Sequence, residues 1–487
     1  MTNKALLAKL TLSSRVSLLL LLLTVSFGIN ANPQLPGGKT TAARLKGKHS
    51  FSQPATNMSL EARMDFNLGQ AIFGKLWVSS PSSTTASDGL GPLYNARSCL
   101  RCHVNNGRGK PPEPDQAQAN ARSLFLRLSI PPQNTADQQT LASGKLAAIP
   151  EPIYGAQLQD QSVQGLAAEG RVRLTYTYST LALAGGEEVE LRQPHYTIDR
   201  LAYGDLHPQL RTSARVTPPM LGLGLLEAIP ESELEKNVAT QKNHPLIAGK
   251  LNKVWDHQQQ KTVVGRFGWK AIQPNLKQQN AAAFIEDIGI STAIFPQGYG
   301  GCTNAQTDCR LLPDGNSEHL GGVEASPVMT QVLEFYTQTL AVPPRRNTQD
   351  AQVLAGEKIF KQLDCAACHR PNYTTAKNSS SHQVHSLLEN QSIWPYTDLL
   401  LHDMGEGLAD NHSEFLASGN QWRTPPLWGI GLTQLISGHS QLLHDGRARS
   451  IQEAILWHGG EAEASKQQFI ALPKDQRQQL IHFVESL

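Results

Sequence analysis

Two different spacings of hydrophobic residues recur along the chain. In residues 171–178, hydrophobic positions alternate with arginine and threonine, which is the period of a strand with one buried face. Gly185 and Gly186 separate this segment from a second alternating one around residues 189–191. Because paired glycines favour a tight turn between strands, the pattern predicts a β-hairpin, and residues 124–128 predict a further strand.

The second spacing is helical and occurs twice. Residues 68–76 and 355–363 each place a glycine four positions before a phenylalanine, so that both positions fall on one helix face. Glycine has no Cβ, which permits a neighbouring helix to approach closely. These pairs are Gly69 with Phe73 and Gly356 with Phe360. A second matching pair, residues 215–225 and 423–432, follows in the same order, so the sequence predicts a duplicated domain.

The first residues of the chain are typical of a secretory signal peptide. Lys4, Lys9 and Arg15 precede an apolar run at residues 16–27, and small residues of the cleavage-site type follow. The run has about a dozen residues, whereas a helix that spans a bilayer needs roughly 20. We therefore expect residues 1–31 to be removed on export, which leaves no stable membrane span. An uncleaved membrane anchor is the alternative.

The remaining chain has a globular composition. Of the 487 residues, 39% are hydrophobic and 17% are charged, which is enough material for two or three packed domains. The formal net charge of +2 falls to about −1 once the three basic residues of the signal peptide are removed, so nothing favours binding of nucleic acid. Cys302 and Cys309 are expected to form a disulfide in an exported protein, and a redox-active pair is the alternative.

Four further cysteines lie in two copies of a Cys-x-x-Cys-His motif. Two thiols three positions apart can add to the two vinyl groups of one porphyrin, and the histidine that follows then lies beneath the ring as an iron ligand. Zinc is the alternative, but it needs more thiolates or histidines at matching spacings. The sequence therefore predicts two covalently bound haem c groups. The motifs are Cys99, Cys102 and His103, and Cys365, Cys368 and His369.

These features divide the chain into segments. An extended lead-in without periodicity covers residues 32–57. A first haem domain covers residues 58–295 and contains a β-rich insertion at about 123–198. A linker at residues 296–346 holds the loop between the two remaining cysteines, and a second haem domain covers residues 347–487.

Beyond the haem motifs, four segments carry a resemblance to a known family: residues 88–103, 265–270, 423–426 and 444–447. Together they resemble the di-haem oxidoreductases of peroxidase type in the bacterial di-haem cytochrome c peroxidase superfamily. The resemblance covers nearly all of the chain after the signal peptide. It implies a mainly α fold of two tandem cytochrome c-like domains, the first with the β-rich insertion, and electron transfer between their haems.

The resemblance also indicates further iron ligands. In the superfamily, a helix after the His-Asp-Gly segment provides the sixth ligand of the second haem, and the corresponding residue here is His458. Met404 is the alternative ligand, and an ordinary histidine at a helix end is the alternative role for His458. The sixth ligand of the first haem is not readable, because His195 and His207 lie in a segment where histidines are more often structural or exposed.

A reactive haem also needs an acid–base group, because peroxide loses a proton on binding and gains one as the O–O bond breaks. The superfamily places a glutamine and an acidic residue there, after an Asp-Gly-Arg turn. The matching candidates are Gln279 with Glu286 or Asp287, and a helix with solvated carboxylates is the alternative.

The chain departs from the superfamily at two places. Val263 and Val264 stand where the peroxidases have Trp-Asp, which leaves the inter-haem tryptophan missing unless Trp269 substitutes for it. Residues 437–441 replace a Thr-x-Pro segment that contributes to an interdomain calcium site in relatives. Calcium therefore stays open but is not predicted.

The resemblance implies a periplasmic oxidoreductase of a Gram-negative type of envelope. The second haem would accept electrons from a small electron-donor protein or cytochrome, and the first would reduce hydrogen peroxide or a similar oxidant. Two alternatives stay open. One is oxidation of a protein or organic substrate, as in a related maturation enzyme, and the other is simple electron transfer by two six-coordinate haems.

Overall fold

The structure is a computed structural model that describes residues 32–487 except residues 85, 115–122 and 378–385. The predicted signal peptide lies outside the described residues. Helices account for 33% of the residues and strands for 17%, and the strands form several two-stranded sheets. The prediction of a mainly α fold is therefore wrong. None of the described helices combines the length and the hydrophobicity that crossing a bilayer requires.

Among the described residues, four helices exceed 11 residues and the others are shorter. The α-helices are α1 (Leu60–Gly74), α2 (Cys99–Cys102), α3 (Thr135–Ala142), α4 (Leu223–Glu227), α5 (Glu231–Gln241), α6 (Leu276–Ala283), α7 (Thr307–Arg310), α8 (Pro327–Thr339), α9 (Ala351–Gln362), α10 (Thr433–Ser437), α11 (Ile451–Leu456), α12 (Glu463–Ala471) and α13 (Lys474–Ser486).

Each strand pairs with one other strand, and every pair is antiparallel. The pairs are β1 (Leu93–Tyr94) with β3 (Gln161–Ser162), β2 (Leu124–Ser129) with β6 (Arg211–Val216), β4 (Arg171–Ala182) with β5 (Glu188–Asp199), β7 (Lys253–Asp256) with β8 (Lys261–Val264), β9 (Tyr373–Thr374) with β10 (Ser392–Ile393), and β11 (Leu401–Asp403) with β12 (Gln421–Arg423).

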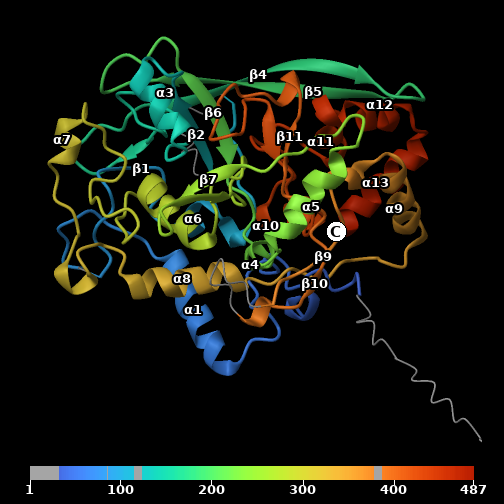
Figure 1. The fold of residues 1–487 in the computed structure, drawn as a ribbon, viewed down its shortest axis with the longest axis horizontal. Helices are drawn as coiled ribbons and strands as arrows, with labels where there is room; N and C mark the ends of the chain where they lie inside the picture. Colours follow the sequence, from blue (N-terminus) through green and yellow to red (C-terminus); the bar gives the residue numbers. More distant parts are fainter. Residues whose placement is uncertain (1–31, 85, 115–122, 378–385) are drawn as a thin grey trace, which may run out of the picture. The chain divides into compact units, whose positions relative to one another are not determined.

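The hairpin predicted from the alternating pattern is confirmed as β4 and β5. The strands pair from Arg171 opposite Asp199 to Ala182 opposite Glu188, and both glycines of the turn have a positive φ, 89° and 80°. This backbone region costs little for a residue without a Cβ. The turn end of the hairpin lies beside α12 (Figure 1), where the Ala184 amide donates to the carbonyl of Ile470 at 2.9 Å.

The predicted close approach of a helix at each repeated glycine is confirmed. A Cβ on Gly69 of α1 would lie 2.5 Å from the Val332 carbonyl oxygen of α8, and a Cβ on Gly356 of α9 would lie 1.9 Å from the Gln479 carbonyl oxygen of α13. No real Cβ sits that near a backbone oxygen, so only glycine permits these crossings. The sequence repeat is thus matched by a repeat of packing, in which a second long helix covers each motif helix.

Buried hydrophobic residues form several clusters. One is centred on α1 and α8 and contains Phe66, Phe73 and Tyr336. Another is centred on α9 and α13, and the tip of the β4–β5 hairpin adds Leu183 and Leu191 to it. A third cluster draws on both halves of the chain, from Phe51 and Leu225 to Trp428 and Ile436. The predicted domain boundaries stay a prediction, because these clusters join the halves rather than separate them.

The predicted linker contains α7 and α8, and α8 packs on α1. The sulfur atoms of Cys302 and Cys309 are bonded to each other, as expected, and both residues are buried. Neither residue lines the cavity described below. The pair therefore closes the loop that leads into α7.

Candidate functional site

One cavity of about 400 Å³ is lined by both Cys-x-x-Cys-His motifs. Its walls are mostly hydrophobic and include Phe73 and Phe360, the phenylalanines of the two repeated helices. Trp269, Trp422 and Trp428 add aromatic surface. A large apolar cavity with a few converging polar groups is typical of a cofactor site. Tertiary folding therefore brings together two motifs that are more than 250 residues apart in sequence.

The first motif forms α2 and the turn that follows it. The Nδ1 atom of His103 lies 3.0 Å from the Pro218 carbonyl oxygen, which sits in the segment repeated later in the chain. Burial lowers the pKa of His103 to about 4, so the imidazole is neutral at physiological pH. A neutral imidazole that donates from Nδ1 leaves the lone pair of Nε2 free to bind a metal. The ring of Phe73 lies beside it, with centroids 5.8 Å apart.

The second motif repeats this arrangement. The Nδ1 atom of His369 lies 3.0 Å from the Tyr396 carbonyl oxygen, and the Phe360 ring lies 6.2 Å from the His369 ring. Burial lowers the pKa of His369 to about 4. In the described part of the chain, neither motif histidine has a hydrogen-bond partner at Nε2. The same donor set at both places is what a metal-binding imidazole requires.

The four cysteines of the motifs are free thiols. Burial raises the pKa of the Cys99 thiol to about 12, and it likewise raises the pKa of the Cys365 thiol to about 12. Such thiols are protonated at physiological pH, and a neutral thiol is compatible with apolar surroundings. The cavity therefore presents four neutral sulfur atoms to an apolar ligand.

His458, predicted as an iron ligand, also lines the cavity. It follows α11, whose first turn is capped by the Ser450 hydroxyl accepting from the Glu453 amide at 3.1 Å. Its Nδ1 atom lies 2.7 Å from the Ala454 carbonyl oxygen, so this ring also keeps Nε2 free. Burial lowers its pKa. Burial is the main cause of the low pKa of His369, and a positive charge on His458 would lower that pKa further. The rings of His369 and His458 are therefore close enough to interact electrostatically.

The other candidate ligands divide clearly. Met404 lines the cavity, so it stays the alternative to His458. His195 and His207 do not line it. His195 is bonded through Nε2 to the Thr177 hydroxyl at 2.9 Å, within the β4–β5 hairpin.

The three candidate acid–base residues all line the cavity, beside the first motif. Gln279 lies on α6, and Glu286 and Asp287 lie in the wide helical turn Phe284–Ile288 that extends it. Glu286 is bonded to Arg127 of β2 at 2.6 Å. Burial raises the pKa of Asp287 to about 7, although Arg127 opposes the rise, and the Gln157 amide donates to its carboxyl at 2.9 Å. Asp287 is thus a carboxyl of the cavity lining that changes charge near neutral pH.

Sequence reasoning missed a set of buried polar groups in the cavity wall. The Nε atom of Arg266, the Nη2 atom of Arg215 and the indole nitrogen of Trp428 are buried without a hydrogen-bond partner in the described residues. A buried donor without an acceptor is costly, so these groups indicate an anionic or polar ligand. Their positions in the sequence could have identified them, because all three lie in repeated segments or in segments that carry the family resemblance: residues 215–225, 265–270 and 423–432.

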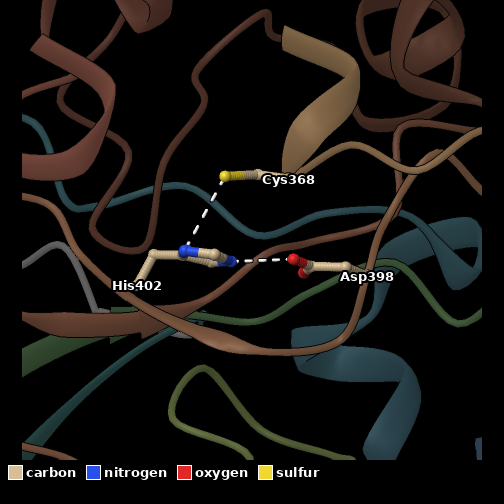
Figure 2. A group of neighbouring side chains, drawn as sticks. All are labelled: Cys368, Asp398 and His402. Carbon is tan, nitrogen blue, oxygen red and sulfur yellow. Dashed lines mark hydrogen bonds and ion pairs between the residues drawn. The ribbon is translucent and has the colours of Figure 1, made fainter. Parts of the chain in front are cut away.

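Sequence reasoning also missed a charged cluster beside the second motif. His402 of β11 is bonded to the Asp398 carboxylate at 2.8 Å and to the Glu461 carboxylate at 2.7 Å, and its Nδ1 atom lies 3.7 Å from the Cys368 sulfur (Figure 2). Burial disfavours a charge on His402, but Asp398 and Glu461 outweigh it and raise its pKa to about 12. The imidazole is therefore a buried cation between two carboxylates.

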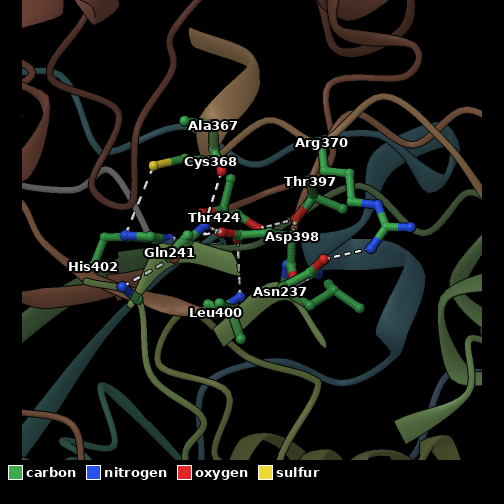
Figure 3. A network of polar contacts seen from close by, with 12 residues as sticks. Asn237, Gln241, Ala367, Cys368, Arg370, Thr397, Asp398, Leu400, His402 and Thr424 are labelled. Carbon is green, nitrogen blue, oxygen red and sulfur yellow. Dashed lines mark hydrogen bonds and ion pairs between the residues drawn. The ribbon is translucent and has the colours of Figure 1, made fainter. Parts of the chain in front are cut away.

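This cluster is fixed by a wider network. The Gln241 amide of α5 donates both to the Asp398 carboxylate and to the Ala367 carbonyl oxygen, each at 2.8 Å (Figure 3). Asp398, His402 and Cys368 are close enough to hold a metal ion. Because Cys368 belongs to the second haem motif, we interpret the cluster as part of that motif's surroundings. The signal for it was the presence of His402 two residues before Met404.

Comparison with known proteins agrees with this geometry. Residues 31–487 match the model of a family described as "Di-haem oxidoreductase, putative peroxidase". The chain belongs to this di-haem oxidoreductase family. The resemblance inferred from the motifs is therefore confirmed, and haem is the cofactor class of the family. At the level of reaction class, the protein is an oxidoreductase.

Other comparisons add little. A search of curated proteins finds no match for this di-haem oxidoreductase. Among solved structures, the chain is similar to hydrazine synthase of Kuenenia stuttgartiensis, at 15% sequence identity and a TM-score of 0.24. The match covers 42% of this chain and 70% of the other. A similarity at this level supports no argument about the site.

Proposed function

We propose that this di-haem oxidoreductase carries two haem c groups, bound covalently through the four motif cysteines, with His103 and His369 as axial ligands. The observation that carries the proposal is the repeated donor set in one cavity. Each motif histidine is neutral, is fixed through Nδ1 to a backbone carbonyl oxygen, and has a free Nε2 atom. Zinc is less well supported, because a zinc site would need more thiolates or histidines at matching spacings than one motif supplies.

The buried donors of the cavity fit the carboxylates of such a cofactor. Arg266, Arg215 and the Trp428 indole each keep a buried nitrogen without a partner, and the lining also includes Arg423, whose pKa burial lowers to about 10. Haem propionates would supply the missing acceptors. His458 is the proposed sixth ligand of the second haem, and Met404 remains the alternative. Bis-histidine ligation would give a lower reduction potential than His/Met ligation.

The proposed reaction is the reduction of hydrogen peroxide by two electrons and two protons to two molecules of water. The haems would supply the two electrons and the iron site at which the O–O bond is cleaved. Asp287 is the proposed acid–base residue, because it lines the cavity, is held by Gln157 and has a pKa of about 7. Gln279 would hold the substrate by hydrogen bonding. Glu286 would instead orient Arg127, to which it is paired.

We further propose that the second haem accepts electrons from a small protein or cytochrome and passes them to the first. The closeness of the two motifs in one cavity supports such a path. The protein would be exported to the periplasm, where haem c is attached and the bond between Cys302 and Cys309 is stable. No partner protein is proposed by name.

The test begins with the purified holoprotein. A pyridine haemochrome spectrum should show two c-type haems per chain, and an electron paramagnetic resonance (EPR) spectrum of the half-reduced protein should show a high-spin ferric signal that peroxide converts. Absence of covalent haem would refute the attachment. Two low-spin signals that ignore peroxide, in the oxidised and half-reduced states, would refute peroxide reduction and leave an electron carrier.

A further inference from the structure

A partly buried arginine, Arg108, contacts both halves of the chain. The Nε atom of Arg108 donates to the Gln441 carbonyl oxygen at 2.9 Å, and its Nη2 atom donates to the Leu443 carbonyl oxygen. Arg108 follows the first haem motif by five residues, whereas its acceptors precede His444, in the second half. Its guanidinium thus joins segments more than 300 residues apart. One of its acceptors, Gln441, belongs to residues 437–441, which by the resemblance replace a segment that contributes to an interdomain calcium site in relatives.

The backbones around Arg108 are held together as well. The Arg108 amide donates to the Ser437 hydroxyl at 2.9 Å, and the His439 Nε2 atom donates to the Arg108 carbonyl oxygen at 3.0 Å. Leu443 has a φ of 71°, a left-handed conformation that a leucine rarely adopts. Such a strained residue persists where its surroundings fix it, and here its carbonyl accepts from the guanidinium.

The Asp445 carboxylate attracts the charge of Arg108, but Asp445 forms its ion pair with Arg447. None of the ion pairs in the described residues includes Arg108. Burial lowers its pKa to about 10, which still leaves the side chain charged at physiological pH. Calcium binds six to eight oxygen ligands, usually including carboxylates. Here the carbonyl oxygens of Gln441 and Leu443 already accept from guanidinium N–H groups, and a divalent cation beside them would be repelled by the positive charge of Arg108. The residues present do not fit calcium.

Arg108 also contacts Trp269, which in sequence lies between the repeated segments 215–225 and 423–432. Its guanidinium carbon is 5.1 Å from the centroid of the Trp269 ring, within the range of a cation–π contact. The Trp269 indole donates to the Val216 carbonyl oxygen at 2.8 Å, and its own carbonyl accepts from the Arg423 amide at 2.9 Å. Arg108 and Trp269 both line the cavity. The Arg108 guanidinium is therefore in contact with Trp269, and Trp269 is hydrogen-bonded to Val216 and to Arg423, which belong to the two copies of the second repeated segment.

We infer that Arg108 is a built-in cation that joins the two halves of the protein in place of a bound calcium ion, and that it positions Trp269 in the cavity. Arg108 is thus a positioning residue, and the haem environment of this protein does not depend on calcium. The inference goes beyond the proposed function and uses it only for one spectroscopic readout.

The first test is made on the unmodified holoprotein. Calcium content is measured by mass spectrometry of the purified protein, and thermal unfolding and EPR spectra are recorded before and after EGTA and after added calcium chloride. We expect far less than one calcium per chain and no change in Tm or spectra. One calcium per chain whose removal changes either readout would overturn the inference. Calcium content and Tm do not depend on whether the protein reduces peroxide, so failure here differs from failure of the proposed function.

The second test compares variants. Arg108→Met removes the cation and should lower Tm by at least about 3 °C and alter the EPR signals. Arg108→Lys keeps the charge and should restore the signals in part. Arg63→Met, an exposed arginine of α1, is the matched control and should change neither. An Arg108→Met protein that equals the control in both readouts would refute the role of Arg108. If it fails to fold, the calcium measurement on the unmodified protein decides.

Discussion

Replacement of Asp287 by asparagine removes one titrating carboxyl from the cavity and keeps the size of the side chain. Burial raises the pKa of Asp287 from 3.8 to about 7. The carboxyl is therefore half ionised near pH 7 and only about 1% ionised at pH 5. If the carboxylate accepts the first proton of peroxide, the rate of the peroxide reaction should rise about tenfold per pH unit below pH 7 and level off above it.

The expected loss in the Asp287→Asn variant is about 10²- to 10⁴-fold at pH 8, the usual contribution of a positioned acid–base group. This corresponds to about 3–5 kcal/mol of activation free energy. Stopped-flow absorbance of the half-reduced holoprotein mixed with hydrogen peroxide, from about pH 5 to 8.5, measures the rate and its pH dependence together. The variant should react slowly at every pH, without the rise.

Glu286→Gln is the matched control. The charge of Glu286 contributes to the high pKa of Asp287, whereas that of Arg127 opposes it. Removing the Glu286 charge should lower the pKa of Asp287, so the rise in rate should move to lower pH while the plateau remains. An Asp287→Asn protein with the rate and pH profile of the unmodified protein would show that Asp287 is not the proton acceptor.

Three further outcomes are expected. His458→Ala should convert the second haem from a low-spin to a high-spin EPR signal, whereas Met404→Leu should not; the reverse result would make Met404 the ligand. Glu169→Gln should flatten the pH dependence of the unfolding free energy. Burial raises the folded pKa of Glu169 from 4.5 to about 8, so the unmodified protein loses up to roughly 5 kcal/mol between these pH values, measured by urea unfolding. Gly356→Ala should cost about 1–3 kcal/mol, because its Cβ would lie 1.9 Å from a carbonyl oxygen of α13. Gly74→Ala should instead gain up to about 0.5–1 kcal/mol, because its Cβ would meet only the Leu100 side chain, at an ordinary contact distance of 3.7 Å. Equal stability of these two glycine variants would contradict the close helix crossing.

Some features could be read directly because their cause is local. The attachment chemistry needs only two thiols and a histidine within five residues, so both motifs are visible in the sequence. The β4–β5 hairpin follows from alternation and a glycine turn within about 30 residues. The close crossing at Gly69 and Gly356 follows from a missing Cβ on a helix face. The sequence also indicated the family, because the motifs were read together.

The fold class was misjudged because most of the remaining strands have no local signal; β2, predicted at residues 124–128, is the exception. Five of the six strand pairs in the described residues have strands of two to six residues, most of them too short to show a period. Two of these pairs join segments more than 60 residues apart in sequence, namely β1 with β3 and β2 with β6. Pairing of this kind is decided by the packing of the whole chain rather than by propensity. A cytochrome-like motif therefore does not make the chain mainly helical.

The candidate site was decided mostly by tertiary structure. The sequence determined which residues can bind a haem, but the carbonyl oxygen that orients His103 belongs to Pro218, 115 residues away. Glu461, one of the two carboxylate partners of His402, is 59 residues away, and the acceptors of the Arg108 guanidinium lie in the other half of the chain. Burial then sets the pKa of Asp287, and no sequence spacing encodes burial. Chemistry that needs only a few neighbouring residues can be predicted from the sequence, whereas electrostatic interactions and hydrogen bonds between distant segments form only when the chain folds.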